Sequence, residues 1–168
     1  AKSRANKHRE AIAEGDALFT SNPHKILYIC TYAELLIAAE KFDQANRLLS
    51  HHLSINPDNA PLAALYADSL TKGQQYDKAE EVLLRQSLVN SQDVDVWYNL
   101  AEVSGKAGNI IGVHKARAEF YALHGAYQKA ISHLEYALRL VSRQDAPSYA
   151  KLNQRIDDLR TALRVARS

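Results

Sequence analysis

The sequence repeats itself at intervals of 34 residues. Two of the repeating columns are Ala33, Ala67 and Ala101, and Phe42, Tyr76 and Ile110. A fixed period of this length indicates that each unit is one supersecondary element, which buries its apolar face only by stacking on its neighbours. We therefore expect an array of helix pairs whose function resides in the surface that it presents.

The repeat columns divide the chain into helix pairs within one domain, residues 1–168. We predict an orphan second helix at 3–20, repeats at 26–59, 60–93 and 94–124, an overlapping fourth repeat at 110–143, and a capping helix at 146–166. Asn56-Pro57-Asp58-Asn59 is expected to end one helix and cap the next, because proline cannot continue a helix and asparagine is a good N-cap. Lys72-Gly73 is expected to mark the turn within the second repeat.

The period changes in the third repeat. Gly108 and Gly125 are only 17 residues apart, which is half a repeat. The helix between them is therefore expected to close the third repeat and to open the fourth. Arg117 stands where a regular second helix would carry an apolar residue, which favours a local irregularity. This shift predicts a pocket beside Gly108–Asn109 or Gly125.

Charge and composition exclude several classes of protein. The 21 basic and 19 acidic side chains give a net charge of +2, which is no electrostatic signature of a nucleic-acid-binding protein. The sequence has no apolar run of about 18 residues, so no membrane-spanning helix is predicted. The single cysteine, Cys30, excludes an internal disulfide and a multi-cysteine zinc site, and we expect it to be a half-exposed thiol or a small packing residue. Methionine is absent even at position 1, so we expect the chain to be part of a longer polypeptide.

The seven histidines do not show the spacing of a metal site. His51 and His52 are adjacent and would point about 100° apart on a helix. His114, His124 and His133 are not separated by one helical turn. No nucleophile elbow or phosphate-binding loop is present either. We therefore predict no catalytic, cofactor-binding or metal-binding residue in this chain.

The recurring residues resemble the signature of the tetratricopeptide repeat over roughly residues 3–140. The matching residues are Trp97; Ala33, Ala67, Ala101 and Ala118; Gly108 and Gly125; Phe42, Tyr76 and Tyr127; Ala45, Ala79 and Ala130; and Pro57. The resemblance implies an all-α solenoid of antiparallel helix pairs, with an irregular half-repeat near residues 108–125 and a C-terminal capping helix. Ser91 departs from the family, which usually has a proline there.

A narrower resemblance lies in KARAEFYALHGAYQKAISHLEYALRLV, followed by YAKLNQRIDDLRTAL. These stretches are similar to the C-terminal end of the beta-barrel assembly-enhancing protease family, periplasmic zinc metalloproteases of Gram-negative bacteria. The resemblance implies a periplasmic adaptor domain that binds its own protease domain, the outer-membrane barrel assembly machinery and client proteins. The family's zinc-binding H-E-x-x-H is absent, so zinc is expected only in a protease domain outside this chain. The alternative is a free-standing repeat scaffold or co-chaperone in secretion or pilus assembly.

An acidic residue follows the small residue of each repeat, at Glu34, Asp68, Glu102 and Glu119. We expect these residues on the concave surface, where a row of carboxylates would disfavour a carboxylate-binding clamp by like-charge repulsion. Such a row would favour a basic segment or the backbone N–H groups of a partner. Ordinary solvation of exposed helix positions is the alternative, since Asp and Glu are common on surfaces.

Several neighbouring residues are candidates for the same partner-binding surface. Lys72 and Lys106 each lie four residues after an acid of the row, close enough on a helix to neutralise part of it. Tyr98 and Asn99 are candidates for an aromatic anchor and a hydrogen-bonding group. Packing between repeats is the alternative role for the tyrosine. Trp97 is expected in the core.

Overall fold

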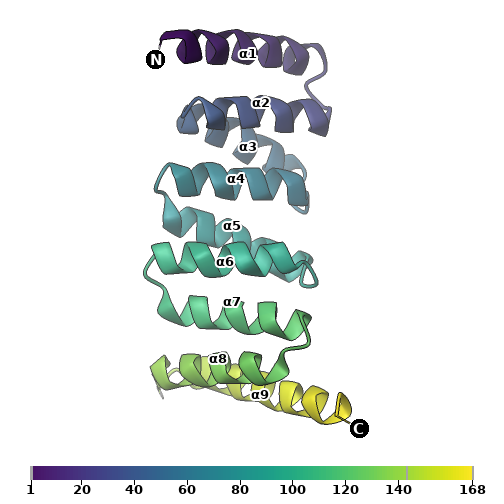
Figure 1. The fold of residues 1–168 in the computed structure, drawn as a ribbon, viewed down its shortest axis with the longest axis vertical. Coiled ribbons are helices and arrows are strands. Elements are labelled where there is room, and N and C mark those ends of the chain that lie inside the picture. The colour runs from purple at the N-terminus through teal and green to yellow at the C-terminus, as the bar shows by residue number, and fades with distance from the viewer. Residues whose placement is uncertain (1, 143, 168) are drawn as a thin grey trace. The chain divides into compact units, whose positions relative to one another are not determined.

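The computed structural model describes residues 2–142 and 144–167, with side chains from Arg9 onward, and every regular element in this part of the chain is an α-helix (Figure 1). The helices are α1 (Lys2–Ser21), α2 (Ile26–Ala38), α3 (Phe42–Ile55), α4 (Ala60–Lys72), α5 (Tyr76–Val89), α6 (Val94–Lys106), α7 (Ile110–Leu123), α8 (Tyr127–Leu140) and α9 (Ala146–Val165). The chain divides into two compact units, Ala1–Val89 and Asn90–Ser168.

In the first unit every helix packs against the next one along the chain, and α2 also contacts α4. The first helices of two successive repeats therefore meet directly. The buried cluster at the centre consists of Ile29, Ala33, Leu36, Ile37, Ala45, Leu49, Leu53, Leu62 and Ala63. Ala33 and Ala45, which belong to the repeat columns, are fully buried. Their small side chains let adjacent helices approach closely at native packing density.

The boundary between the two repeats of this unit follows the predicted signals. Helix α3 ends at Ile55, two residues before Pro57. The Oδ1 of Asn59 then accepts a hydrogen bond from the backbone N–H of Leu62, at 3.0 Å, which satisfies one of the free donors at the start of α4.

The turn within the second repeat lies one residue later than predicted. Gln74 has the left-handed φ of 59°, whereas Gly73 has a φ of −79° and caps α4. Gly73 is needed for a different reason. A Cβ atom there would lie 3.2 Å from the Ser69 carbonyl oxygen and 3.4 Å from Cβ of Phe42. A side chain at this position would therefore crowd mainly the last turn of α4 itself.

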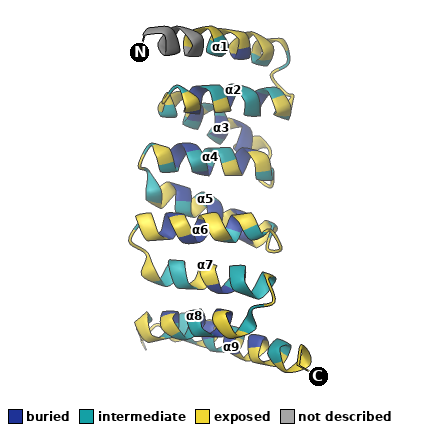
Figure 2. Cartoon of the chain, viewed as in Figure 1, coloured by how far each residue is buried: buried dark blue, intermediate teal, exposed yellow. Residues whose placement is uncertain are grey.

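In the second unit, α6 to α9 follow one another as antiparallel helices (Figure 1), and α7 contacts both α6 and α8. Helix α3 of the first unit also contacts both of its neighbours, so this packing does not test whether α7 closes one repeat and opens the next. The buried residues of α7 are both small, Ala116 and Ala118. Most of its larger side chains are only half-buried, as its colours in Figure 2 show. The large side chains of α7 are therefore partly accessible at the surface of the second unit.

The turns on both sides of α7 carry the predicted glycines. Gly108 and Gly125 have φ values of 77° and 69°, the left-handed conformation that glycine adopts without strain. Asn109 then caps α7 by accepting a hydrogen bond from the backbone N–H of Gly112, at 2.8 Å. Local chemistry therefore determines where this short helix begins and ends.

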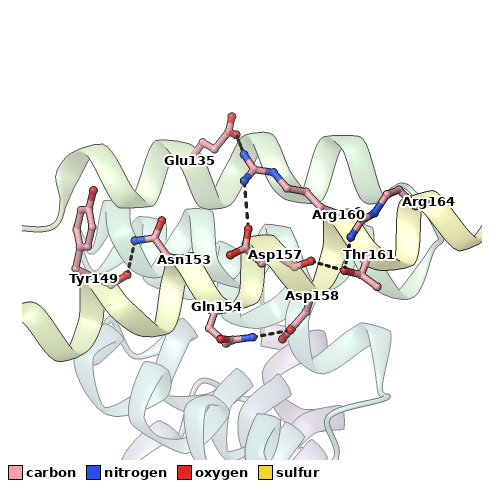
Figure 3. Close-up of polar contacts among 9 residues, drawn as sticks. All are labelled: Glu135, Tyr149, Asn153, Gln154, Asp157, Asp158, Arg160, Thr161 and Arg164. Carbon is pink, nitrogen blue, oxygen red and sulfur yellow. Dashed lines mark hydrogen bonds and ion pairs between the residues drawn. The ribbon is translucent and has the colours of Figure 1, made fainter.

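Helix α9 closes the second unit by packing against α8. Its buried residues, Leu152, Ile156 and Leu159, form one apolar stripe. On the outer side, Arg160 donates hydrogen bonds to Glu135 of α8 and to Asp157, each at 3.2 Å (Figure 3). The helix thus combines an apolar face towards α8 with a charged face towards solvent, as expected of a capping helix.

Candidate functional site: the two sides of helix α7

The two acidic candidates of the first unit lie on α2 and α4. Asp68 is paired as its spacing predicted, because Nζ of Lys72 lies 2.7 Å from its Oδ2. Glu34 is exposed and forms no ion pair with any described residue. It lies one turn after Cys30, which packs half-buried against the core cluster. Burial and, to a smaller extent, the charge of Glu34 raise the pKa of the Cys30 thiol, which disfavours the reactive thiolate.

On one side of α7, two of the predicted residues come together. A pocket of about 350 Å³ is lined by Tyr98, Ala101 and Glu102 of α6 and by Arg117, Phe120 and Tyr121 of α7. The ring centroids of Tyr98 and Phe120 are 5.9 Å apart, and Tyr98 is 53% exposed. Within the described part of the chain, Glu102 forms no ion pair with Lys106. Asn99 is exposed but does not line this pocket.

The aromatic surface continues from this pocket onto α8. Tyr121 stacks on His133, and His114 stacks on Tyr136, with centroids 5.3 Å apart and an interplanar angle of 18° in each pair. The Nδ1 atoms of His114 and His133 share a hydrogen bond of 3.0 Å. The guanidinium of Arg139 lies 4.3 Å from the centre of the Tyr136 ring. We call this series of rings the aromatic face; it consists of Tyr98, Phe120, Tyr121, His133, His114 and Tyr136.

Both histidines of the aromatic face are held towards the neutral form. Burial, followed by the positive charges of Arg117 and Arg139, lowers the pKa of His114. Burial, followed by His114 and Arg117, lowers the pKa of His133. Neutral rings suit this hydrogen bond, in which one Nδ1 donates and the other accepts. The sequence spacing of 19 residues did not reveal this pair, because only the antiparallel packing of α7 on α8 brings the two rings together.

The other side of α7 faces α9. Arg155 donates from Nε to Oε1 of Glu119 at 2.9 Å and from Nη2 to Oε2 at 2.6 Å. This bidentate hydrogen bond is the largest cause of the raised pKa of Arg155. The carboxylate of Glu119 is therefore engaged within the chain. Of the four acids in the predicted row, only Glu34 and Glu102 have no ion pair with a described residue.

A second pocket, of about 390 Å³, lies beside this ion pair. It is lined by Trp97, Ile111, Lys115, Glu119, Leu134, Val141, Asp145, Ser148, Lys151, Leu152 and Arg155. Trp97 is therefore half-buried at a pocket wall, not in the core as predicted. Its Nε1–H donates to the carbonyl oxygen of Ser91 at 2.8 Å, the position where the family usually has a proline. Neither pocket of α7 is lined by Gly108, Asn109 or Gly125, the turn residues where a pocket was expected.

The described residues contain no group of three His, Cys, Asp or Glu side chains that could hold a metal ion. In the same part of the chain, no helix has the length and apolarity needed to cross a membrane. What the two pockets offer is a set of aromatic rings, apolar side chains and a few charges, which is the composition of a binding surface.

Comparison with known proteins identifies the repeat. Residues 36–103 match the tetratricopeptide repeat family. In solved structures, the chain is similar to MamA, with a TM-score of 0.62, 12% identity and coverage of 99% of this chain and 95% of that one. It is also similar to TTC0263, a tetratricopeptide-repeat protein of Thermus thermophilus, with a TM-score of 0.55, 14% identity and coverage of 92% and 91%. At these identities the likeness concerns the fold alone, and the predicted fold class is confirmed.

The sequence itself is similar to beta-barrel assembly-enhancing proteases. It is 31% identical to the Escherichia coli K12 protein over 158 residues, which cover 93% of this chain but 32% of the relative. A putative relative from Vibrio cholerae is 32% identical over 94 residues, or 56% of this chain and 19% of the relative. The chain therefore has the tetratricopeptide-repeat fold and resembles about a third of the length of the beta-barrel assembly-enhancing protease of Escherichia coli.

Proposed function

We propose that this chain is the protein-binding adaptor domain of a periplasmic polypeptide that acts in the assembly and quality control of outer-membrane β-barrel proteins. The observation that carries the proposal is the similarity of 93% of the chain to a beta-barrel assembly-enhancing protease. Tetratricopeptide repeats generally bind proteins through extended surfaces and are not catalytic. The partners would be a protease domain of the same polypeptide, the barrel assembly machinery and client proteins. The zinc of such a protease would lie outside this chain.

We infer that Glu34 in the first unit and Glu102 in the second are the carboxylates of the predicted row that bind a basic partner segment. Asp68 and Glu119 are already paired with Lys72 and Arg155. Glu102 shares its pocket with exposed Tyr98, so a basic partner segment would find a carboxylate beside an aromatic anchor. Glu34 offers a second exposed carboxylate on α2.

The proposal is tested by site-specific photocrosslinking in Gram-negative cells that produce the complete native polypeptide. A photoreactive amino acid replaces Tyr98, and the adducts are identified by mass spectrometry. We expect adducts with a component of the barrel assembly machinery or with an outer-membrane barrel protein. Adducts with neither would overturn the role in barrel assembly.

Charge reversal tests the acidic surface separately. Glu34→Lys with Glu102→Lys is expected to lower the adduct yield about tenfold, a change worth about 1.4 kcal/mol of binding. The matched control is Glu10→Lys with Glu14→Lys, which makes the same charge change on exposed positions of α1. Equal yields in both variants would show that the acids play no part, while leaving the role in assembly standing.

The mass of the native polypeptide separates this proposal from a free-standing scaffold or co-chaperone in secretion or pilus assembly. A much heavier polypeptide with H-E-x-x-H outside this segment supports the adaptor domain. A native mass near 18.8 kDa, the mass of this chain, would overturn it.

A further inference from the structure

We propose that the pocket between α7 and α9 binds a protein segment in which an acidic side chain stands next to a large apolar side chain. The inference rests on the proposed protein-binding function. It adds a second site on the other side of α7 from Glu102, with a ligand of the opposite charge. Helix α7 would then bind two kinds of segment, one on each side. Arg117 lines one pocket and Glu119 the other, because residues two positions apart on a helix point to nearly opposite sides.

The walls of the pocket suit one large apolar side chain. Five of the eleven lining residues are hydrophobic, namely Trp97, Ile111, Leu134, Val141 and Leu152. The volume of about 390 Å³ lies within the range of ligand-binding pockets, about 300–1,000 Å³. The indole N–H of Trp97 is already bonded to Ser91, so the ring offers apolar surface without an unmet donor.

The charges of the pocket leave a positive excess. Glu119 is compensated by the two hydrogen bonds that it accepts from Arg155. Asp145 accepts a hydrogen bond from the backbone N–H of Ser148 at 3.2 Å and keeps its negative charge, so the three cations of the lining exceed its two acids by one. Lys115 and Lys151 line the same pocket, are exposed, and form no ion pair with any described residue. Two ammonium groups beside an apolar wall attract a carboxylate that is attached to an apolar group.

The lining favours an acidic side chain over the terminal carboxylate of a partner. It contains no Asn or Gln, whose amides would hold the main chain of a peptide at its end. Lysines are flexible point charges and follow a carboxylate on a mobile side chain. The ligand is therefore an internal segment with Asp or Glu beside Phe or Leu.

The test uses the single tryptophan of the chain, Trp97, as the reporter. The complete chain is titrated with an acetylated and amidated peptide, Gly-Ser-Glu-Phe-Ser-Gly, while tryptophan fluorescence is followed. A saturable change below about 1 mM is expected. The same peptide with Gln in place of Glu should bind at least about tenfold more weakly, since it lacks the charge.

Two variants show whether the pocket is responsible. Lys115→Gln with Lys151→Gln should weaken binding of the Glu peptide about tenfold. Lys25→Gln with Lys41→Gln removes the same charge from exposed positions of the first unit and should change binding less than about twofold. These outcomes together support the proposal.

Three outcomes would overturn it. The fluorescence does not saturate, the Gln peptide binds as tightly as the Glu peptide, or only a peptide that ends in Phe with a free carboxylate binds. The last outcome would assign the site to chain termini. None of them affects the crosslinks at Tyr98, which report on the other side of α7, so failure here is distinguishable from failure of the adaptor function.

Discussion

The two units of the chain build the same turn from different residues. In the first unit the left-handed position is occupied by Glu40 and Gln74, each with a φ of 59°. In the second unit it is occupied by Gly108 and Gly125. A residue with a Cβ is strained in this conformation by about 1–2 kcal/mol, whereas glycine is not. The backbone conformation of the turn is therefore the same in both units, although the residue type at its left-handed position differs.

The units also differ in how their charged residues pair. In the first unit Asp68 and Lys72 pair within one helix, four residues apart. In the second unit Arg160 and Asp157 also pair within one helix, but Glu119 and Arg155 pair between α7 and α9, 36 residues apart in the sequence. Helix α7 packs against α6 and α8 and also reaches α9 through Glu119. Its exposed positions consequently become the walls of two pockets.

The largest expected effect comes from breaking a turn of the second unit. Gly108→Ala should lower the free energy of unfolding by about 1–2 kcal/mol, because the alanine must adopt a left-handed φ. A Cβ at this position meets no atom within 4 Å, so the cost is that of the backbone alone. Urea denaturation followed by circular dichroism measures the change.

The reverse substitution in the first unit tests the strain at a left-handed residue that has a Cβ atom. Gln74→Gly should raise the free energy of unfolding by less than about 1 kcal/mol, because relief of the strained φ is partly offset by the greater freedom of glycine in the unfolded chain. If Gly108→Ala and Gln74→Gly change stability in the same direction, the strain argument is wrong.

A smaller effect is expected from the ion pairs. Glu119→Gln should lower the free energy of unfolding by about 1 kcal/mol, because it weakens a bidentate hydrogen bond between groups that are 23% and 40% exposed. Lys72→Gln should cost only about 0.3 kcal/mol, the usual value for an exposed pair within one helix. Equal losses in the two denaturation curves would contradict the distinction between the units.

The smallest effect is a pH dependence located on the aromatic face. The pKa values of His114 and His133 are lowered in the folded chain, so both residues bind protons more weakly there than in the unfolded chain. Stability is therefore highest above the ordinary pKa of 6.5 and falls as the pH decreases below it towards the folded-state values. Urea midpoints between about pH 7.5 and 5 measure this loss.

A paired substitution assigns the pH dependence to these two rings. His114→Phe with His133→Phe keeps the aromatic stack but removes both titrating groups, so the loss of stability at low pH should shrink. Part of it should remain, because burial also lowers the pKa of His52 in the first unit. An unchanged pH profile would show that the histidine pair does not contribute.

The candidate site was only partly predictable from the sequence. Tyr98 and Glu102 were found because they lie within one helical turn, and local spacing alone places them on one surface. Phe120 and Tyr121 were missed because their spacing from Tyr98 carries no signal until α6 packs on α7. The repeat position of Trp97 predicts a core residue, yet Trp97 lines a pocket.

The helices, the cap at Asn59 and the turn glycines Gly108 and Gly125 follow from local interactions, so they can be predicted from the sequence. Each of these depends on residues within one or two helical turns, such as Asn59 with Leu62 or Asn109 with Gly112. Tertiary structure alone decided which distant side chains meet, above all Glu119 with Arg155. The physical reason is that such contacts depend on how helices far apart in the sequence are positioned against one another, and repeat spacing does not encode that arrangement once the period has shifted.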